Sequence, residues 1–197
     1  MDYQGVKNFI LKKLSTELNP NLFYHDLNHT LDVLSSVERL AELENISAHE
    51  TTLIKTASLF HDSGMLKTYI GHEEASCEIT AQYLPEFGYS DNDVAFINKM
   101  ILTTKLPQSA KTLSENIICD ADLDYLGRDD FFMISHRLRH EWSLFKFKTL
   151  SLKDWYFLQI DFLSKHQYFT QSAHKTREMG KQHNLHQIFE IMNGFQK

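Results

Sequence analysis

The sequence predicts an all-α protein, and three observations support this fold class. The 197 residues include only three prolines and seven glycines, so few positions interrupt a helix. Apolar residues recur at intervals of three and four positions, and no alternating pattern of convincing strand length appears. A chain of this length can bury a full core without disulfide bonds. We therefore expect a single helical domain over residues 1–197.

The first two helices are predicted from amphipathic patterns. Residues 1–18 place lysines among apolar positions without the continuous apolar run or cleavage motif of a signal peptide, so we interpret them as a packing helix. The second helix begins near His29 and continues one apolar face at helical spacing. The members of this face are Val33, Val37, Leu40 and Ala41.

Capping and breaking residues delimit the later helices. Ser47, with Glu50 three positions on, has the pattern of a capping box and begins a helix that leads to His61. Gly64 and Gly71 bracket a loop. Further helices are expected over residues 73–84, 91–104, 129–147, 152–166 and 170–194.

Composition and charge exclude several classes of protein. The net charge is -6, and no lysine or arginine stripe dominates any segment, which argues against a nucleic-acid-binding surface. No run approaches the ~20 apolar residues of a membrane span. Cys77 and Cys119 lie far apart and match no metal-binding spacing, so we expect a reducing, cytoplasmic compartment.

Histidines and aspartates form the most informative pattern. Residues 24–29 read Tyr-His-Asp-Leu-Asn-His, the doublet His61-Asp62 follows, and Asp120 and Asp122 complete the series. A single histidine on an apolar helix face is usually a buried core residue. Two of them with an interior Asp62 favour a metal site, because a buried carboxylate without a partner is costly and a metal ion accepts both ligand types. Imidazole and carboxylate suit a divalent ion.

This ordered set on a helical background resembles the HD superfamily of metal-dependent phosphohydrolases. The segment at residues 24–29 is similar to the Tyr-His-Asn-x-x-His segment of cyclic-nucleotide phosphodiesterases, with Asp26 in place of the usual asparagine. The core of the resemblance covers residues 24–127, and residues 128–197 are expected to be helices that pack on it. The run at residues 139–142 is similar to an uncharacterised bacterial branch of predicted HD phosphohydrolases.

The resemblance implies that His29, His61 and Asp62 are ligands of one divalent ion, which could be Mn, Mg, Co, Zn or Fe. The remaining aspartate ligand stays open. The phosphodiesterase pattern favours Asp122, whereas other HD enzymes favour Asp120, which we prefer. The aspartate that is not the ligand would orient a histidine or a water.

The phosphodiesterase resemblance also gives His25 a catalytic role, beside Asp62. His25 would be the general acid that protonates the leaving oxygen, with Asp26 helping to keep it protonated. The alternative is a loop histidine that is hydrogen-bonded to the backbone.

Substrate-binding residues are predicted at three positions. His72 and Glu73 follow Gly71 at a helix start and are expected to line the site, although acidic residues are also favoured at helix N-termini for electrostatic reasons alone. Arg139 lies in the run of the C-terminal resemblance. Lys105, Lys111 and Arg137 are further candidates for phosphate binding, or simply solvated side chains.

The leading hypothesis for function is metal-dependent hydrolysis of a small-molecule phosphoester, with a nucleotide as the expected substrate. One alternative is a catalytically silent HD module that binds a nucleotide and signals. Another is a di-iron oxygenase, which would need additional histidines, of which only His72 is well placed. Aromatic residues in the C-terminal third either form a homodimer face or complete the core.

Overall fold

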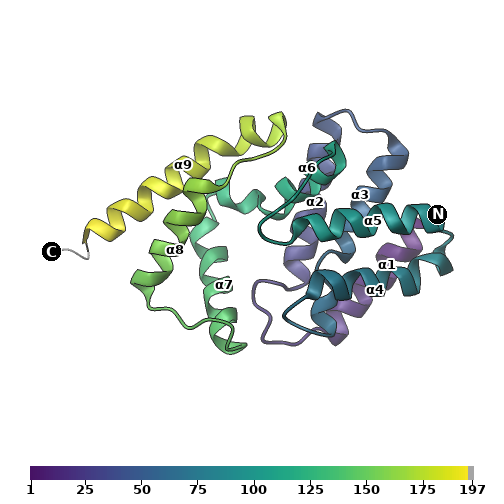
Figure 1. Cartoon of the computed structure of the whole chain (residues 1–197), viewed down its shortest axis with the longest axis horizontal. Coiled ribbons are helices and arrows are strands. Elements are labelled where there is room, and N and C mark those ends of the chain that lie inside the picture. Colours follow the sequence, from purple (N-terminus) through teal and green to yellow (C-terminus); the bar gives the residue numbers. More distant parts are fainter. Residues whose placement is uncertain (195–197) are drawn as a thin grey trace.

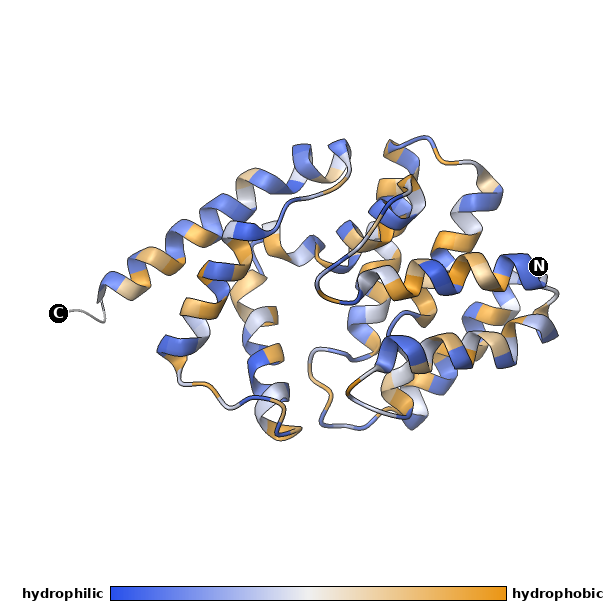
Figure 2. Ribbon diagram, in the orientation of Figure 1, coloured by the Kyte–Doolittle hydropathy of each residue, from blue (hydrophilic) through white to orange (hydrophobic). Residues whose placement is uncertain are grey.

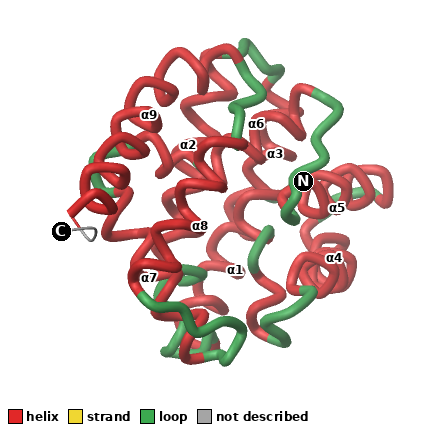
Figure 3. The backbone as a smooth tube through the Cα atoms, turned by 60° about the vertical axis from the view of Figure 1, so that its left-hand side comes forward, coloured by secondary structure: helices red, strands yellow, loops and turns green. Residues whose placement is uncertain are grey.

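Helices carry most of the residues in the computed structural model, which describes residues 1–194 (Figure 3). No strand occurs within that range, so the predicted all-α class is confirmed. The α-helices are α1 (Tyr3–Glu17), α2 (Leu27–Leu43), α3 (Ala48–Phe60), α4 (His72–Tyr83), α5 (Asp91–Thr104), α6 (Leu113–Asp122), α7 (Phe131–Leu144), α8 (Leu152–Lys165) and α9 (Gln171–Gly194). Short 3-10 helices are η1 (Ser63–Leu66), η2 (Leu84–Phe87) and η3 (Asp124–Gly127).

Side-chain caps explain where many of these helices begin. An aspartate, serine or threonine accepts a hydrogen bond from the amide three positions on, which satisfies one free N–H of the first turn. These caps are Asp2, Asp26, Ser47, Ser90, Thr112 and Ser151. The capping box predicted at Ser47 forms only in part, because the Glu50 carboxylate contacts the hydroxyl of Ser114 on α6 instead.

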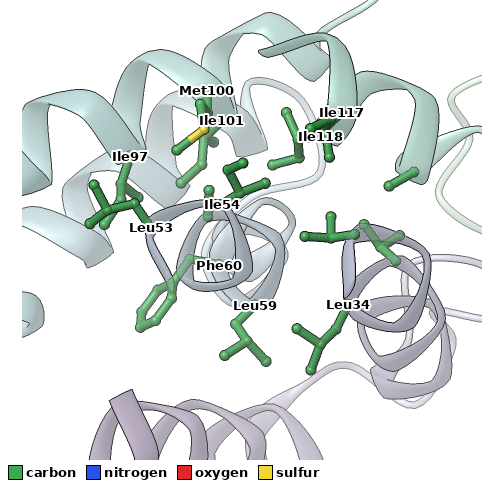
Figure 4. Close-up of a cluster of buried hydrophobic side chains, with 14 of the residues drawn as sticks. Leu34, Leu53, Ile54, Leu59, Phe60, Ile97, Met100, Ile101, Ile117 and Ile118 are labelled. Carbon is green, nitrogen blue, oxygen red and sulfur yellow. The ribbon is translucent and has the colours of Figure 1, made fainter. Parts of the chain in front are cut away.

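The first hydrophobic cluster is formed by the helices from α1 through α6. The expected apolar face of α2 is buried, and α3 lies in the middle of this cluster, with Ile54 and Phe60 fully buried. Figure 4 shows side chains of α2, α5 and α6 around α3. The labelled members from those helices are Leu34, Ile97, Met100, Ile101, Ile117 and Ile118.

A second hydrophobic cluster joins η3 and the C-terminal helices. Trp155 of α8 and Phe131 of α7 are fully buried there, and Ile188 contributes from α9. Gly127 and Gly180 let α9 approach η3 closely, because a Cβ atom on Gly180 would lie 2.1 Å from the Gly127 carbonyl oxygen. In Figure 1, α7, α8 and α9 lie on one side of the molecule and α1, α3, α4 and α5 on the other.

Polar and apolar residues alternate around the helical turns, as expected for amphipathic packing helices (Figure 2). Within residues 1–194, no helix is both long and apolar enough to cross a membrane. The sequence did not predict α6 as a separate helix, although Thr112 and Glu115 form a complete capping box at its start.

Candidate metal centre

His29, His61 and Asp122 bring three potential ligand atoms together. His29 lies in the first turn of α2, His61 follows the last residue of α3, and Asp122 ends α6. The two Nε2 atoms of the histidines are 3.2 Å apart, and Asp122 Oδ1 lies 3.2 Å from that of His29. Ligands bound about 2.1 Å from one ion lie roughly 3.0–3.4 Å from one another, so these spacings fit a shared metal ion.

Asp62 completes this group. Its Oδ2 atom lies 3.1 Å from His61 Nε2 and 3.3 Å from His29 Nε2. The same oxygen is buried and has no hydrogen-bond partner among the described residues. A buried carboxylate oxygen without a donor is costly, and a divalent ion between these atoms would satisfy it. The residues present therefore fit a metal ion.

A second cluster shares Asp62 with the first. Asp62 Oδ1 lies 3.3 Å from His72 Nε2, and one atom each from His25, Asp62 and His72 lie within 4.8 Å of one another. The two oxygens of Asp62 thus face two different sets of imidazoles. This geometry can accommodate one ion beside His29 and His61 and another beside His25 and His72.

Backbone carbonyls orient two of the imidazoles. His61 Nδ1 is 2.8 Å from the Ser58 carbonyl oxygen, and His72 Nδ1 is 3.1 Å from the Tyr69 carbonyl oxygen. A carbonyl can only accept, so each Nδ1 carries a hydrogen, and each Nε2 is the nitrogen that could bind a metal ion once it has lost its proton.

Charge complementarity in the centre shifts the ionisation of its members. Burial opposes the charge of His29, but the carboxylates of Asp122 and Asp62 outweigh it and raise its pKa to about 9. His72 follows the same pattern beside Asp62, with a pKa of about 9. Burial likewise opposes the charge of Asp122, but the adjacent imidazoles lower its pKa to about 2. Carboxylates are therefore ionised at neutral pH, and a metal ion would compete with protons for the histidines.

Glu141 of α7 holds the segment that carries His25. Its Oε1 contacts His25 Nδ1 and accepts a hydrogen bond of 2.9 Å from the Tyr69 hydroxyl. Its Oε2 accepts the backbone amides of Tyr24 at 2.8 Å and His25 at 3.1 Å. The Glu141 side chain is fully buried, and burial opposes its charge, but the contact with His25 and these amides lower its pKa.

Close backbone packing brings Asp62 and His72 together. A Cβ atom on Gly64 would lie 1.9 Å from the His72 carbonyl oxygen, so only glycine allows η1 to pack this closely against the start of α4. Ser76 of α4 fixes the same contact. Its hydroxyl accepts a hydrogen bond from the Gly64 amide and donates one to the His61 carbonyl, both at 2.8 Å.

The two clusters open into a cavity of about 640 Å³. Asp62, Asp122, His25 and His72 line it on the metal side. The opposite wall comes from α7, α8 and the loop between them. Its apolar members are Leu138, Trp142, Phe147, Leu158 and Phe162.

Comparison with known families agrees with this geometry. A model of the HD domain matches residues 26–124, which include His29, the His61-Asp62 doublet and both aspartates. The chain belongs to the HD-domain family. This confirms the resemblance on which the metal ligands were predicted. No match was found among curated proteins.

One solved structure shares the HD fold of this chain. It is a predicted HD superfamily hydrolase from an uncultured Thermotogales bacterium, with a TM-score of 0.63 and 19% sequence identity. The alignment covers 98% of this chain and 92% of that chain, so the likeness extends through the C-terminal helices.

The HD-domain structure separates the two candidate aspartates. Asp122 joins His29 and His61, whereas Asp120 points to the other side of α6. The Asp120 carboxylate accepts hydrogen bonds of 2.8 Å from the amides of Phe169 and Thr170 and from the Thr170 hydroxyl. The preference for Asp120 as the ligand is thus corrected by the geometry, because both of its oxygens are already engaged.

Other predicted site residues divide into two groups. His72 and Glu73 line the cavity, and Glu73 Oε1 lies 3.6 Å from His72 Nε2. Arg139 does not line it. The Arg139 guanidinium donates a hydrogen bond of 2.7 Å to the Leu150 carbonyl, so it ties α7 to the loop before α8.

The three lysine and arginine side chains considered for phosphate binding differ in whether they line the cavity. Lys105 lines the cavity and pairs with Glu74, whereas Lys111 and Arg137 do not line it. Asp26, expected to support the protonated state of His25, instead caps α2 by accepting the His29 amide at 2.9 Å.

Glu141 is the residue to which the sequence assigned no role. It lies within the run at residues 139–142 that carried the C-terminal resemblance, but there the sequence predicted a role only for Arg139. Its partners His25 and Tyr69 are more than seventy positions away. No local spacing reveals a contact of that kind.

Proposed function

We propose that this HD-domain protein is a metal-dependent phosphohydrolase that cleaves a phosphoester of a nucleotide or a related small molecule. The observation that carries the proposal is the convergence of His29, His61, Asp62 and Asp122, in which the buried Asp62 Oδ2 has no hydrogen-bond partner among residues 1–194. When bound there, a divalent ion would supply Lewis-acid polarisation of the phosphoryl group and lower the pKa of a water molecule.

His25 is proposed as the general acid. His25 lines the cavity, and Glu141 contacts its Nδ1, which leaves Nε2 as the free nitrogen of the ring. Nε2–H would donate its proton to the leaving oxygen as the ester bond breaks. Tyr69, which donates to the same Glu141 carboxylate, would hold that acceptor in place.

Turnover with a panel of phosphoesters tests the proposal. The purified protein would be assayed with Mn²⁺, Mg²⁺, Co²⁺, Zn²⁺ and Fe²⁺ on nucleoside monophosphates, cyclic nucleotides and aryl phosphates. Asp62→Ala should abolish turnover. Stoichiometric metal binding without turnover of any ester would contradict a hydrolase and favour a silent nucleotide-binding module.

Leaving-group dependence tests the role of His25. A general acid matters most when the leaving oxygen is basic, so His25→Asn should lower kcat on alkyl phosphates about 100-fold. The same variant should lower kcat on 4-nitrophenyl phosphate less than about tenfold. An equal loss on both esters would contradict the assignment.

The second cluster favours one alternative, a di-iron oxygenase. Two histidines, His25 and His72, form the second potential ligand cluster with Asp62, and His72 Nε2 lies 3.3 Å from Asp62 Oδ1. Oxygen consumption by the Fe²⁺-loaded protein, absent in His72→Asn and without matching phosphate release, would support the oxygenase. Phosphate release without oxygen consumption would contradict it.

A further inference from the structure

The cavity wall opposite the metal centre is apolar and comes from helices outside the residues matched by the HD-domain model. Leu138 and Trp142 project from α7, and Leu158 and Phe162 from α8. The volume of about 640 Å³ is within the range of pockets that enclose a small organic ligand. A substrate whose phosphoryl group binds at the metal centre would therefore place its organic group against this wall.

Charge in the cavity is unfavourable for a polyphosphate. Among the described lining residues, Lys105 is the single lysine or arginine, and Glu74 already pairs with it. Glu73 and Glu74 add negative charge beside the metal centre. Sites that bind a polyphosphate chain surround it with arginine, lysine or backbone amides. Among the described lining residues, this cavity offers no set of arginine and lysine side chains, and the first turn of α4, which lines it, carries the carboxylates of Glu73 and Glu74.

Gln159 is the polar exception within the apolar wall. It is 4% exposed, lines the cavity between Leu158 and Phe162, and its side-chain amide makes no hydrogen bond to another described residue. A wholly apolar group lying over this amide would leave its donors and acceptor unpaired, which is costly. The amide thus favours an organic group with one hydrogen-bonding function at that point.

We propose that the substrate is a phosphoester with a single phosphoryl group and an uncharged, largely apolar organic group that packs between α7 and α8 and meets Gln159. This inference rests on the proposed hydrolase function and names its substrate class. Polyphosphates are poor substrates under this proposal, and esters of small alcohols bind weakly.

Comparison of substrates and wall variants tests the proposal. We expect kcat/KM for 1-naphthylmethyl phosphate to exceed that for methyl phosphate, whose alkoxide leaving group is similarly basic, and that for ATP at least 100-fold. Phe162→Ala and Leu158→Ala should each raise KM for 1-naphthylmethyl phosphate at least tenfold and leave KM for methyl phosphate within twofold. Phe157→Ala is the matched control, since Phe157 lies on the same helix, is exposed and does not line the cavity.

Gln159→Leu tests the polar exception. Because it removes an amide that a wholly apolar group would leave unpaired, it should lower the Kd of 1-naphthylmethyl phosphonate at least threefold. A weakened or unchanged affinity would overturn the role of Gln159.

A non-hydrolysable ligand separates the two proposals. Binding of 1-naphthylmethyl phosphonate to the metal-loaded protein would be measured by calorimetry. Binding that weakens in Phe162→Ala but not in Phe157→Ala, in a protein that hydrolyses no ester, supports the pocket chemistry and overturns the hydrolase. Hydrolysis of ATP at a rate equal to that of 1-naphthylmethyl phosphate overturns the substrate class and leaves the hydrolase standing.

Discussion

Asp120 and Asp122 have different partners, although a single residue separates them. Residues two positions apart on a helix point ~200° away from each other, so only one of the pair can face His29. The sequence offered both aspartates, with a preference for Asp120 that rested only on the pattern of other HD enzymes. The choice depends on the rotation of α6 and on Phe169 and Thr170, about fifty positions later.

Matched substitutions should separate the roles of these two residues. Asp122→Asn removes a negative charge from the metal centre and should weaken metal binding on the order of 100-fold. Asp120→Asn should leave metal affinity within about threefold and lower the melting temperature, because it leaves donors of Thr170 unpaired. Calorimetric metal titration checks both. Loss of metal binding in Asp120→Asn alone would contradict the assignment.

The stability of the metal-free protein should depend on pH through its histidines. The pKa values of His29 and His72 are raised to about 9 in the folded chain, above the ordinary value of 6.5. Their stabilising contribution is fully present below pH 6.5 and is lost as the pH rises through about 9. With a chelator present, the melting temperature should fall by ~5 °C between pH 6.5 and pH 9.5.

Scanning fluorimetry at the two pH values measures this effect. The metal-loaded protein is the control, since a bound metal ion holds the histidines deprotonated and should flatten the dependence. A melting temperature of the chelated protein that rises with pH would show that the carboxylates do not govern these imidazoles.

At the scale of elements, the helices were largely predictable because each is amphipathic and many begin at a capping residue. The sequence located α2 by its apolar face and α5 over residues 91–104. It passed over α6, which is short, although its own capping box was readable. How helices pack was not predictable, because glycine contacts such as Gly127 with Gly180 join segments distant in sequence.

The contact between α9 and η3 should be sensitive to a single methyl group. Gly180→Ala places a Cβ atom against the Gly127 carbonyl and should destabilise the protein by ~2 kcal/mol, even though alanine favours helix. Urea denaturation measures the change. Gly194→Ala is the matched control, because its Cβ would meet no atom within 4 Å. Equal stability of the two variants would contradict tight packing at this contact.

At the scale of the whole molecule, the metal centre lies between two hydrophobic clusters. One cluster is formed by the helices from α1 through α6, and the other by η3 together with α7, α8 and α9. Glu141 links them, since it projects from α7 and holds the amides of Tyr24 and His25 before α2. The predicted division into a core and packing C-terminal helices therefore omits that α7 contributes directly to the site.

Glu141→Gln should test this link between the two hydrophobic clusters. Glutamine retains the shape but lacks the charge that faces the His25 ring, so kcat should fall about 100-fold while metal affinity stays within threefold. The loss of kcat should be larger on alkyl phosphates than on 4-nitrophenyl phosphate, as for His25→Asn. A stable, metal-binding variant with unchanged activity on both esters would contradict the positioning role.

Helix α6 carries one residue of the metal centre and also the residue that holds the start of the last helix. Asp122 faces the histidines, and Asp120, on the same two turns of α6, holds the first residues before α9. A metal ion that orders Asp122 therefore also orders the Asp120 carboxylate, which accepts hydrogen bonds from the residues just before α9. Amide protons at the start of α9 should therefore exchange with solvent more slowly when metal is bound. Hydrogen exchange in the C-terminal helix would then measure whether the metal centre is occupied.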